Sequence, residues 1–180
     1  ISDDDAFKPL STHVQELKTE FESKHTNISI FHPKSGKGKT LEYELCTANP
    51  TSELLITDSF PKSNSAHTVE NYKKLITKYA KCSDDFDSLL NCYKSLLNIE
   101  DIKEKPVLKS LVDANWDNEE KKSALMATIY YEIVSKAKGA HAFYLEKNLR
   151  DNLDEGVDKK NFQVPDYIED AIKEVLEIKS

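Results

Sequence analysis

The chain has 180 residues, of which 38% are hydrophobic and 32% are charged, and its net charge at pH 7 is −7. This length suits one domain with a core of its own. The acidic balance argues against a general nucleic-acid binder, which would present a basic face, and against docking on anionic lipid. No stretch approaches the roughly 20 consecutive apolar residues that a membrane-spanning helix needs.

The N-terminal residues are expected to form an acidic tail followed by one helix. Residues 1–9 contain three consecutive aspartates and a proline. Residues 10–24 carry apolar side chains at helical spacing, which predicts an amphipathic helix. The apolar positions are Leu10, Val14, Leu17 and Phe21.

The pattern then changes to a period of two residues, which predicts β-strands over about 27–32, 40–46 and 53–58. In the second run the apolar residues are Leu41, Tyr43 and Leu45. Polar residues lie between them, as in a half-buried strand. Because Asn49-Pro50 separates the second run from the third, the sequence predicts a small antiparallel β-hairpin or meander.

A glycine-containing loop, HPKSGKGKT (32–40), joins the first two predicted strands and partly matches the phosphate-binding loop of nucleotide-binding proteins. Gly38-Lys39-Thr40 fits the end of that motif, but Pro33 occupies its first glycine position. The motif also needs a helix after it, whereas the next residues alternate as a strand would. The loop is therefore interpreted as a solvated hairpin tip. A plain solubilising loop is the preferred interpretation, and contact of its lysines with an acidic partner is the alternative. Its basic residues are Lys34, Lys37 and Lys39.

From residue 68 onward the apolar spacing is helical throughout. Pro106 suits the first turn of a helix, and Asp166 is expected to begin the last one. A long helical pattern runs over about 118–153, and Gly139 is expected to kink or divide it. The predicted fold is thus mainly α (α+β), a single domain over 10–180. An antiparallel bundle over 68–180 surrounds the long helix, and the small β element lies within 10–60.

The segment DANWDNEEKKSA (113–124) resembles the start of a calcium-binding loop. Asp113, Asn115 and Asp117 occupy the first, third and fifth positions, but the sixth is Asn118 instead of glycine. The twelfth position, which should be a bidentate glutamate, is Ala124. The simpler interpretation is a polar turn whose Asp and Asn side chains cap the next helix, and no metal site is predicted.

The chain has three cysteines and five histidines, and their spacing matches few known kinds of disulfide or metal site. Cys82 and Cys92 are predicted to lie too far apart for a disulfide, beyond the roughly 7 Å that Cα atoms allow. Cys46 is left open as a partner for either. No two histidines have the spacing of a zinc site. His141 is most simply a hydrogen-bonded histidine in the core or at its boundary.

The preferred function is a non-enzymatic binding protein that recognises a protein partner or an apolar small ligand between helices. The adjacent aromatic residues of the long helix cannot all face one narrow stripe, so the predicted binding residues are Tyr130, Tyr131, His141 and Tyr144, with Lys34, Lys37 and Lys39. No cofactor is predicted. The alternative is a small hydrolase or transferase in which His141 or Cys92 takes part. The glycosylation sequon Asn27-Ile28-Ser29 favours a secretory route.

Overall fold

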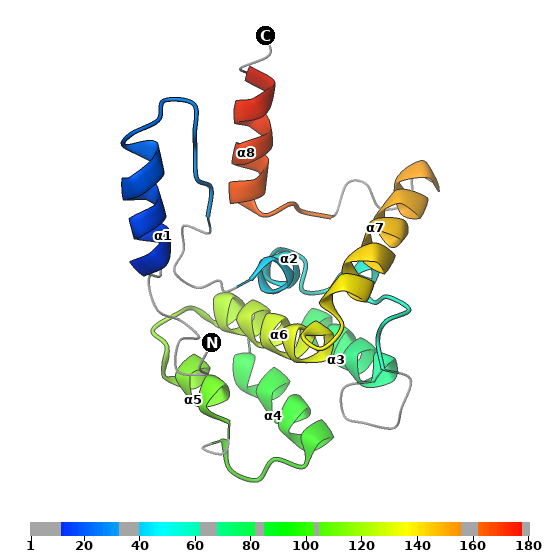
Figure 1. The fold of residues 1–180 in the computed structure, drawn as a ribbon. Coiled ribbons are helices and arrows are strands. Elements are labelled where there is room, and N and C mark those ends of the chain that lie inside the picture. The colour runs from blue at the N-terminus through cyan, green and yellow to red at the C-terminus, as the bar shows by residue number, and fades with distance from the viewer. Residues whose placement is uncertain are drawn as a thin grey trace.

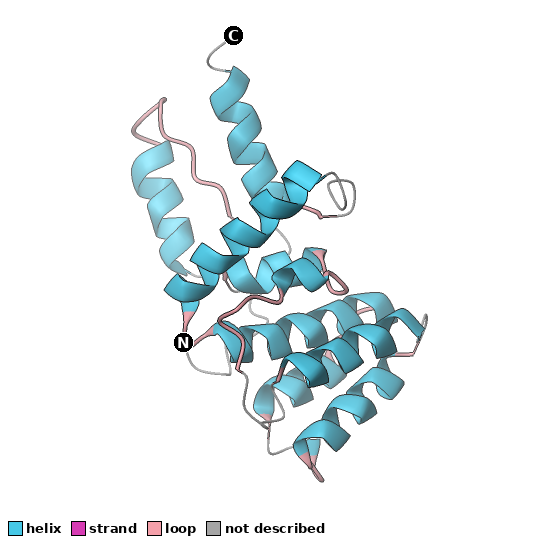
Figure 2. Ribbon diagram, turned by 90° about the vertical axis from the view of Figure 1, so that its right-hand side faces the viewer, coloured by secondary structure: helices cyan, strands magenta, loops and turns pink. Residues whose placement is uncertain are grey.

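The computed structural model describes residues 12–32, 40–61, 68–81, 85–102, 105–155 and 162–177. Every regular element within these ranges is helical (Figure 1, Figure 2). The elements are α1 (Thr12–Leu17), the π-helical turn η2 (Lys18–Glu22), α2 (Leu41–Ala48), the 3₁₀ turn η3 (Glu53–Leu55), α3 (Val69–Lys81), α4 (Phe86–Leu97), α5 (Pro106–Asp113), α6 (Asn118–Val134), α7 (Lys138–Glu155) and α8 (Asp166–Glu177). Across these ranges, no helix combines the length and the apolar character that crossing a membrane requires.

Helix α6 is the centre of the fold because its side chains are buried on nearly every side. The consecutive run Ala124–Tyr130 is buried, and so are Ile133 and Val134 one turn later. Such an all-round apolar helix is stable only when other helices cover it. Helix α2 packs most extensively on α6, and α4 and α5 also contact it, while α3 packs against α4.

The helices lie on two sides of the layer that α2 and α6 form. Helices α3, α4 and α5 pack on one side as a small bundle, and α1, α7 and α8 project on the other (Figure 1, Figure 2). The buried hydrophobic cluster runs from Tyr43 in α2 to Leu145 in α7. A helical bundle therefore fits the structure, whereas the predicted α+β class is wrong because the described residues form only helices. The N-terminal third supplies part of the core.

The strand predicted over 40–46 is wrong, because these residues form α2. The Thr40 side chain accepts a hydrogen bond from the Tyr43 backbone N–H at 3.4 Å and so caps the first turn. Glu42 and Glu44 lie in that turn, where carboxylates complement the helix dipole. The alternating pattern was misleading because Leu41 is 49% exposed and does not share a buried face with Tyr43.

The strands predicted over 27–32 and 53–58 are also wrong. Residues 28–32 are irregular, and the Ile30 N–H donates to Glu22 Oε1 at 2.6 Å instead of to a neighbouring strand. Residues 53–55 form η3, and the Asn148 side chain of α7 donates to the carbonyl oxygens of Leu54 and Ile56, at 3.2 and 3.0 Å. Helix side chains thus satisfy the backbone groups that a sheet would have paired. The predicted hairpin tip lies largely outside the described residues.

The division of the long helical pattern over 118–153 is confirmed. Helix α6 ends at Val134, and α7 begins at Lys138, one residue before Gly139. The His141 N–H bonds to the Ala137 carbonyl at 2.8 Å and closes the first turn of α7. This break turns α7 away from α6 and carries His141 back onto the core.

Candidate functional site

Two of the predicted binding residues, Tyr130 and His141, meet inside the core, where α6, α7 and residues 57–59 come together. Their side chains are 0% and 1% exposed, and the Tyr130 hydroxyl is hydrogen-bonded to His141 Nε2. On the other side of the ring, His141 Nδ1 lies 3.0 Å from Thr57 Oγ1 and 3.3 Å from Ser59 Oγ. Both ring nitrogens therefore have hydroxyl partners, and the expectation of a hydrogen-bonded core histidine is confirmed.

The surroundings of this group are apolar and aromatic. Burial lowers the pKa of His141, and the negative charge of Glu42 opposes this only in part. Burial also raises the pKa of the Cys46 thiol to about 12, although its contact with the Tyr72 hydroxyl, at 3.2 Å, acts in the opposite direction. A buried thiol that remains protonated is a poor nucleophile. The burial and hydrogen bonds of His141 and Cys46 thus support a structural role for both side chains in the core.

Tyr131 and Tyr144 are half-buried, and Tyr131 packs at the edge of the core. The ammonium group of Lys138 sits 4.9 Å from the centre of the Tyr131 ring, an arrangement that a cation–π interaction stabilises. Tyr144 packs edge-to-face against Phe143, with 5.4 Å between ring centres, and Phe143 is 65% exposed. The structure therefore separates these two tyrosines from the buried pair, and their part in binding stays a prediction.

The remaining sequence motifs do not contribute to a site that the structure describes. Lys34, Lys37 and Lys39 lie outside the described residues, as does Cys82. In the calcium-like segment, Asp117 forms a capping box with Glu120, in which its side chain accepts from the Glu120 N–H at 2.8 Å. The capping interpretation of that segment is thus confirmed.

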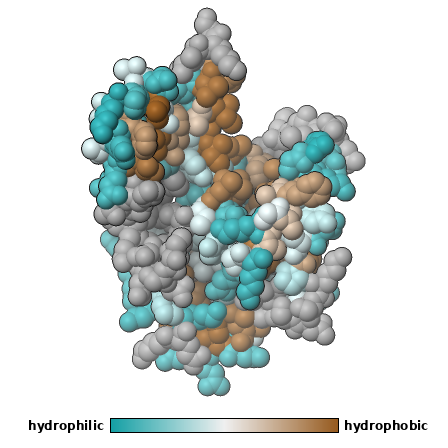
Figure 3. All heavy atoms as spheres, in the orientation of Figure 1, coloured by the Kyte–Doolittle hydropathy of each residue, from teal (hydrophilic) through white to brown (hydrophobic). Residues whose placement is uncertain are grey.

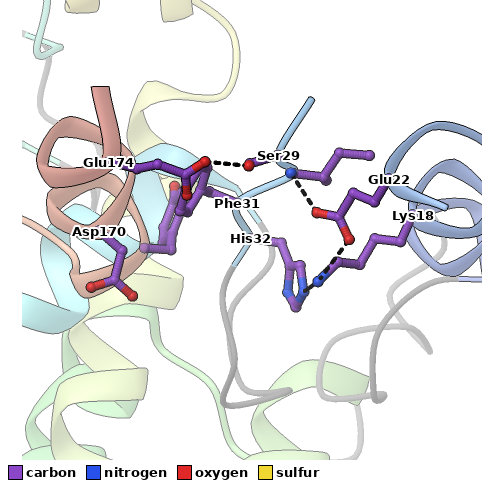
Figure 4. A pocket seen from close by; sticks show the side chains of 9 residues that line it. Lys18, Glu22, Ser29, Phe31, His32, Asp170 and Glu174 are labelled. Atoms are coloured by element: carbon purple, nitrogen blue, oxygen red, sulfur yellow. Dashed lines mark hydrogen bonds and ion pairs between the residues drawn. The ribbon is translucent and has the colours of Figure 1, made fainter. Parts of the chain in front are cut away.

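A polar pocket of about 250 Å³ lies between the N-terminal region and α8 (Figure 4). Lys18 and Glu22 line it from one side and form an ion pair at 3.7 Å. Lys18 Nζ also lies 3.5 Å from His32 Nε2. On the other side, the Ser29 hydroxyl donates to a carboxylate oxygen of Glu174 in α8. Most polar groups of this pocket therefore bind one another, and the Ser29–Glu174 contact holds α8 beside the segment that follows η2.

A second contact fixes the start of α8 against the core. The buried side chain of Asn49, which follows α2, bonds to both backbone groups of Gln163. Its Nδ2 donates to the Gln163 carbonyl at 2.7 Å, and its Oδ1 accepts from the Gln163 N–H, also at 2.7 Å. Phe162 packs on the hydrophobic core beside this contact. The chain that leads into α8 is thus anchored, although the helix projects away from the core (Figure 1).

Helix α8 covers one face that mixes polar and apolar side chains, and it leaves part of its apolar face exposed. Tyr167, Asp170 and Glu174, which share one face, line the pocket and are half-buried. The apolar residues Ile172, Val175 and Leu176 are 52%, 55% and 60% exposed. Figure 3 shows hydrophobic residues exposed along α8. We call Ile172, Val175 and Leu176 the α8 stripe.

The α8 stripe was missed in the sequence because the spacing reveals only an amphipathic helix. Apolar residues at 168, 172, 175 and 176 predict a helix with one apolar side. By default that side is assigned to the core. The orientation depends on the Asn49–Gln163 and Ser29–Glu174 contacts, which join positions more than a hundred residues apart. The five carboxylates among the residues of α8 were the available signal, because they mark a helix with a strongly charged surface.

Comparison with known proteins adds no relative: no protein-family description, no curated protein and no solved structure matches this chain.

Proposed function

We propose that this chain is a non-enzymatic interaction protein that docks a helical segment of a protein partner on the α8 stripe. The observation that carries the proposal is the exposure of the α8 stripe beside carboxylates that are partly covered. Ile172, Val175 and Leu176 are more than half exposed, while Asp170 and Glu174 of the same helix are partly covered. An amphipathic helix that packed for stability alone would place these faces the other way round.

The energetics favour a partner that covers this surface. Burying the exposed half of an Ile, Val or Leu side chain releases about 1 kcal/mol. The three residues follow the i, i+3, i+4 spacing of one helix face, which is the pattern that another helix covers most readily. Contiguous exposed apolar surface of this kind marks interaction sites in soluble proteins.

Photo-crosslinking from the stripe tests the proposal. A photoreactive amino acid at position 172 is expected to trap a protein in an extract of the source organism, whereas one at position 146, on the exposed surface of α7, is not. The trapped protein is then identified and purified, and its Kd for the untreated chain is measured by calorimetry.

Matched substitutions decide whether the trapped protein docks on the stripe. Leu176→Asp is expected to weaken binding by about tenfold or more, since it places a charge where an apolar contact forms. Phe143→Asp is the control, because Phe143 is equally exposed but lies on α7, and it is expected to change the Kd by less than about twofold. Equal binding by the wild-type and Leu176→Asp chains would contradict the proposal.

The secretory route is proposed separately, on the exposed sequon. Asn27 is exposed in the turn that follows η2, so an N-linked glycan would have room there.

A further inference from the structure

The charges that surround the α8 stripe indicate the chemistry of its partner. Helix α8 contains five carboxylate residues and one lysine. The lysine, Lys173, already forms an ion pair with Glu169 at 2.7 Å. Its pKa is raised by the hydrogen bond to Glu169 and by the negative charges of Glu169, Asp170 and Asp166. The field along this helix is therefore negative.

The carboxylates divide between the two sides of the helix. Asp170 and Glu174 face the pocket, where Glu174 accepts from Ser29. Asp166 and Glu169 are exposed. Glu169 is one turn before Ile172 and Lys173 and two turns before Leu176, so it lies along the outer edge of the α8 stripe. A partner that covers the stripe would thus meet the Glu169 carboxylate, with its ion-pair partner Lys173, at the edge of its contact.

Other occupants fit this surface less well. Two copies of the chain that paired stripe to stripe would bring their carboxylate edges together, and each chain carries a net charge of −7. Such like-charge pairing opposes association. Anionic lipid is repelled for the same reason.

We propose that the partner segment is a basic amphipathic helix. Its apolar face covers Ile172, Val175 and Leu176, and its lysine or arginine side chains lie beside Glu169, with Asp166 one turn before that residue. This inference rests on the proposed docking function and adds the sign of the partner's charge. The twelve residues of α8 correspond to about 18 Å of helix, so a partner segment of about four turns matches its length.

Two synthetic peptides test the sign of the partner's charge directly. Both have about 18 residues, with leucines at i, i+3, i+4 and i+7 spacing. One has lysine at its remaining positions and the other has glutamate. Each carries a fluorescein label, and binding to the full chain is followed by fluorescence anisotropy. We expect the lysine peptide to bind at least about tenfold more tightly than the glutamate peptide. Raising the salt from about 50 mM to about 500 mM is expected to weaken the lysine complex, because screening acts on the exposed charges.

Neutral substitutions separate the charged edge from the apolar contact. The double variant Asp166→Asn, Glu169→Gln is expected to weaken the lysine peptide by about threefold to tenfold and to reduce its salt dependence. The control is Glu146→Gln, which removes an exposed carboxylate from α7 and is expected to leave the Kd unchanged. Leu176→Ser is expected to weaken the binding of both peptides, since both have leucines at the same spacing.

The outcomes distinguish failure of this inference from failure of the docking function. Equal or tighter binding of the glutamate peptide, still sensitive to Leu176→Ser, would overturn the basic partner and leave the docking function standing. A dimer that is seen by analytical sedimentation and that Leu176→Ser dissociates would also overturn the basic partner, because a second copy of the chain would then occupy the stripe. If Leu176→Ser leaves the Kd of the lysine peptide unchanged, both the basic partner and the docking function are overturned, because the contact then does not involve the stripe.

Discussion

The imidazole of His141 links the stability of the core to pH. Its pKa is lowered in the folded chain because burial disfavours the charged ring, whereas in the unfolded chain a histidine titrates near its ordinary value of about 6.5. Above that pH both states hold a neutral ring, and His141 contributes no pH dependence. Below it the unfolded state takes up a proton that the folded state resists. The free energy of unfolding therefore falls as the pH drops from about 6.5 towards the folded pKa.

Replacing His141 with glutamine is expected to remove this pH dependence. At pH 7.5, His141→Gln should be less stable by about 1–2 kcal/mol, because the bonds to Tyr130 and Thr57 are disturbed. Between pH 7 and pH 5 its free energy of unfolding should fall less steeply than that of the wild type. Urea unfolding at several pH values measures both effects. Asn91→Gln, at an exposed position of α4, serves as the control and should keep the wild-type slope. A wild-type slope in His141→Gln would contradict the account.

At the scale of the element, α2 shows why a short alternating run does not settle the secondary structure. Residues 40–46 alternate over only seven positions, and two buried positions three apart satisfy a helix equally well: Tyr43 and Cys46. The local signals that decide the case are the Thr40 cap and the glutamates of the first turn. Because α2 covers α6, reading it as a strand, together with the two other wrong strands, gave the wrong class for the whole fold.

The cap of α2 is expected to contribute measurably to stability. Thr40→Ala removes the side-chain acceptor for the Tyr43 N–H and should lower the free energy of unfolding by about 0.5–1 kcal/mol. Thr40→Ser keeps the acceptor and should stay close to the wild type. Thermal unfolding followed by circular dichroism checks this order. If Thr40→Ala and Thr40→Ser are equally stable, the cap does not hold the helix.

On the scale of the whole molecule, the sequence predicts the helices after residue 68 well and the orientation of α8 poorly. The helical spacing after residue 68, Pro106 at the start of α5 and the break near Gly139 all follow from local chemistry, and the structure contains them. The buried position of His141 was also anticipated. The outward direction of the α8 stripe was not, because it is set by contacts between residues distant in the chain.

Removing α8 is expected to leave the rest of the molecule folded. The hydrophobic core extends from Tyr43 to Leu145 and includes no residue of α8. A chain that ends at Pro165 keeps the Asn49–Gln163 contact and Phe162. Its thermal midpoint should therefore lie within about 4 °C of the full chain, a change of less than about 1 kcal/mol. Differential scanning calorimetry measures this, and a much lower midpoint would show that α8 belongs to the cooperative unit.

The bonds around His141 also restrict how the interior can be arranged. Apolar side chains tolerate many alternative packings, but a hydrogen bond requires a particular direction and distance. Here one ring must satisfy Tyr130 on α6 and Thr57 on an irregular segment at the same time. A shift of α7 along its axis by a single turn would leave the His141 ring and the hydroxyls of Tyr130 and Thr57 buried without hydrogen bonds. Burying polar groups without partners destabilises the fold. The His141 ring thus fixes the packing position of α7 along α6, whereas apolar contacts alone would permit several positions.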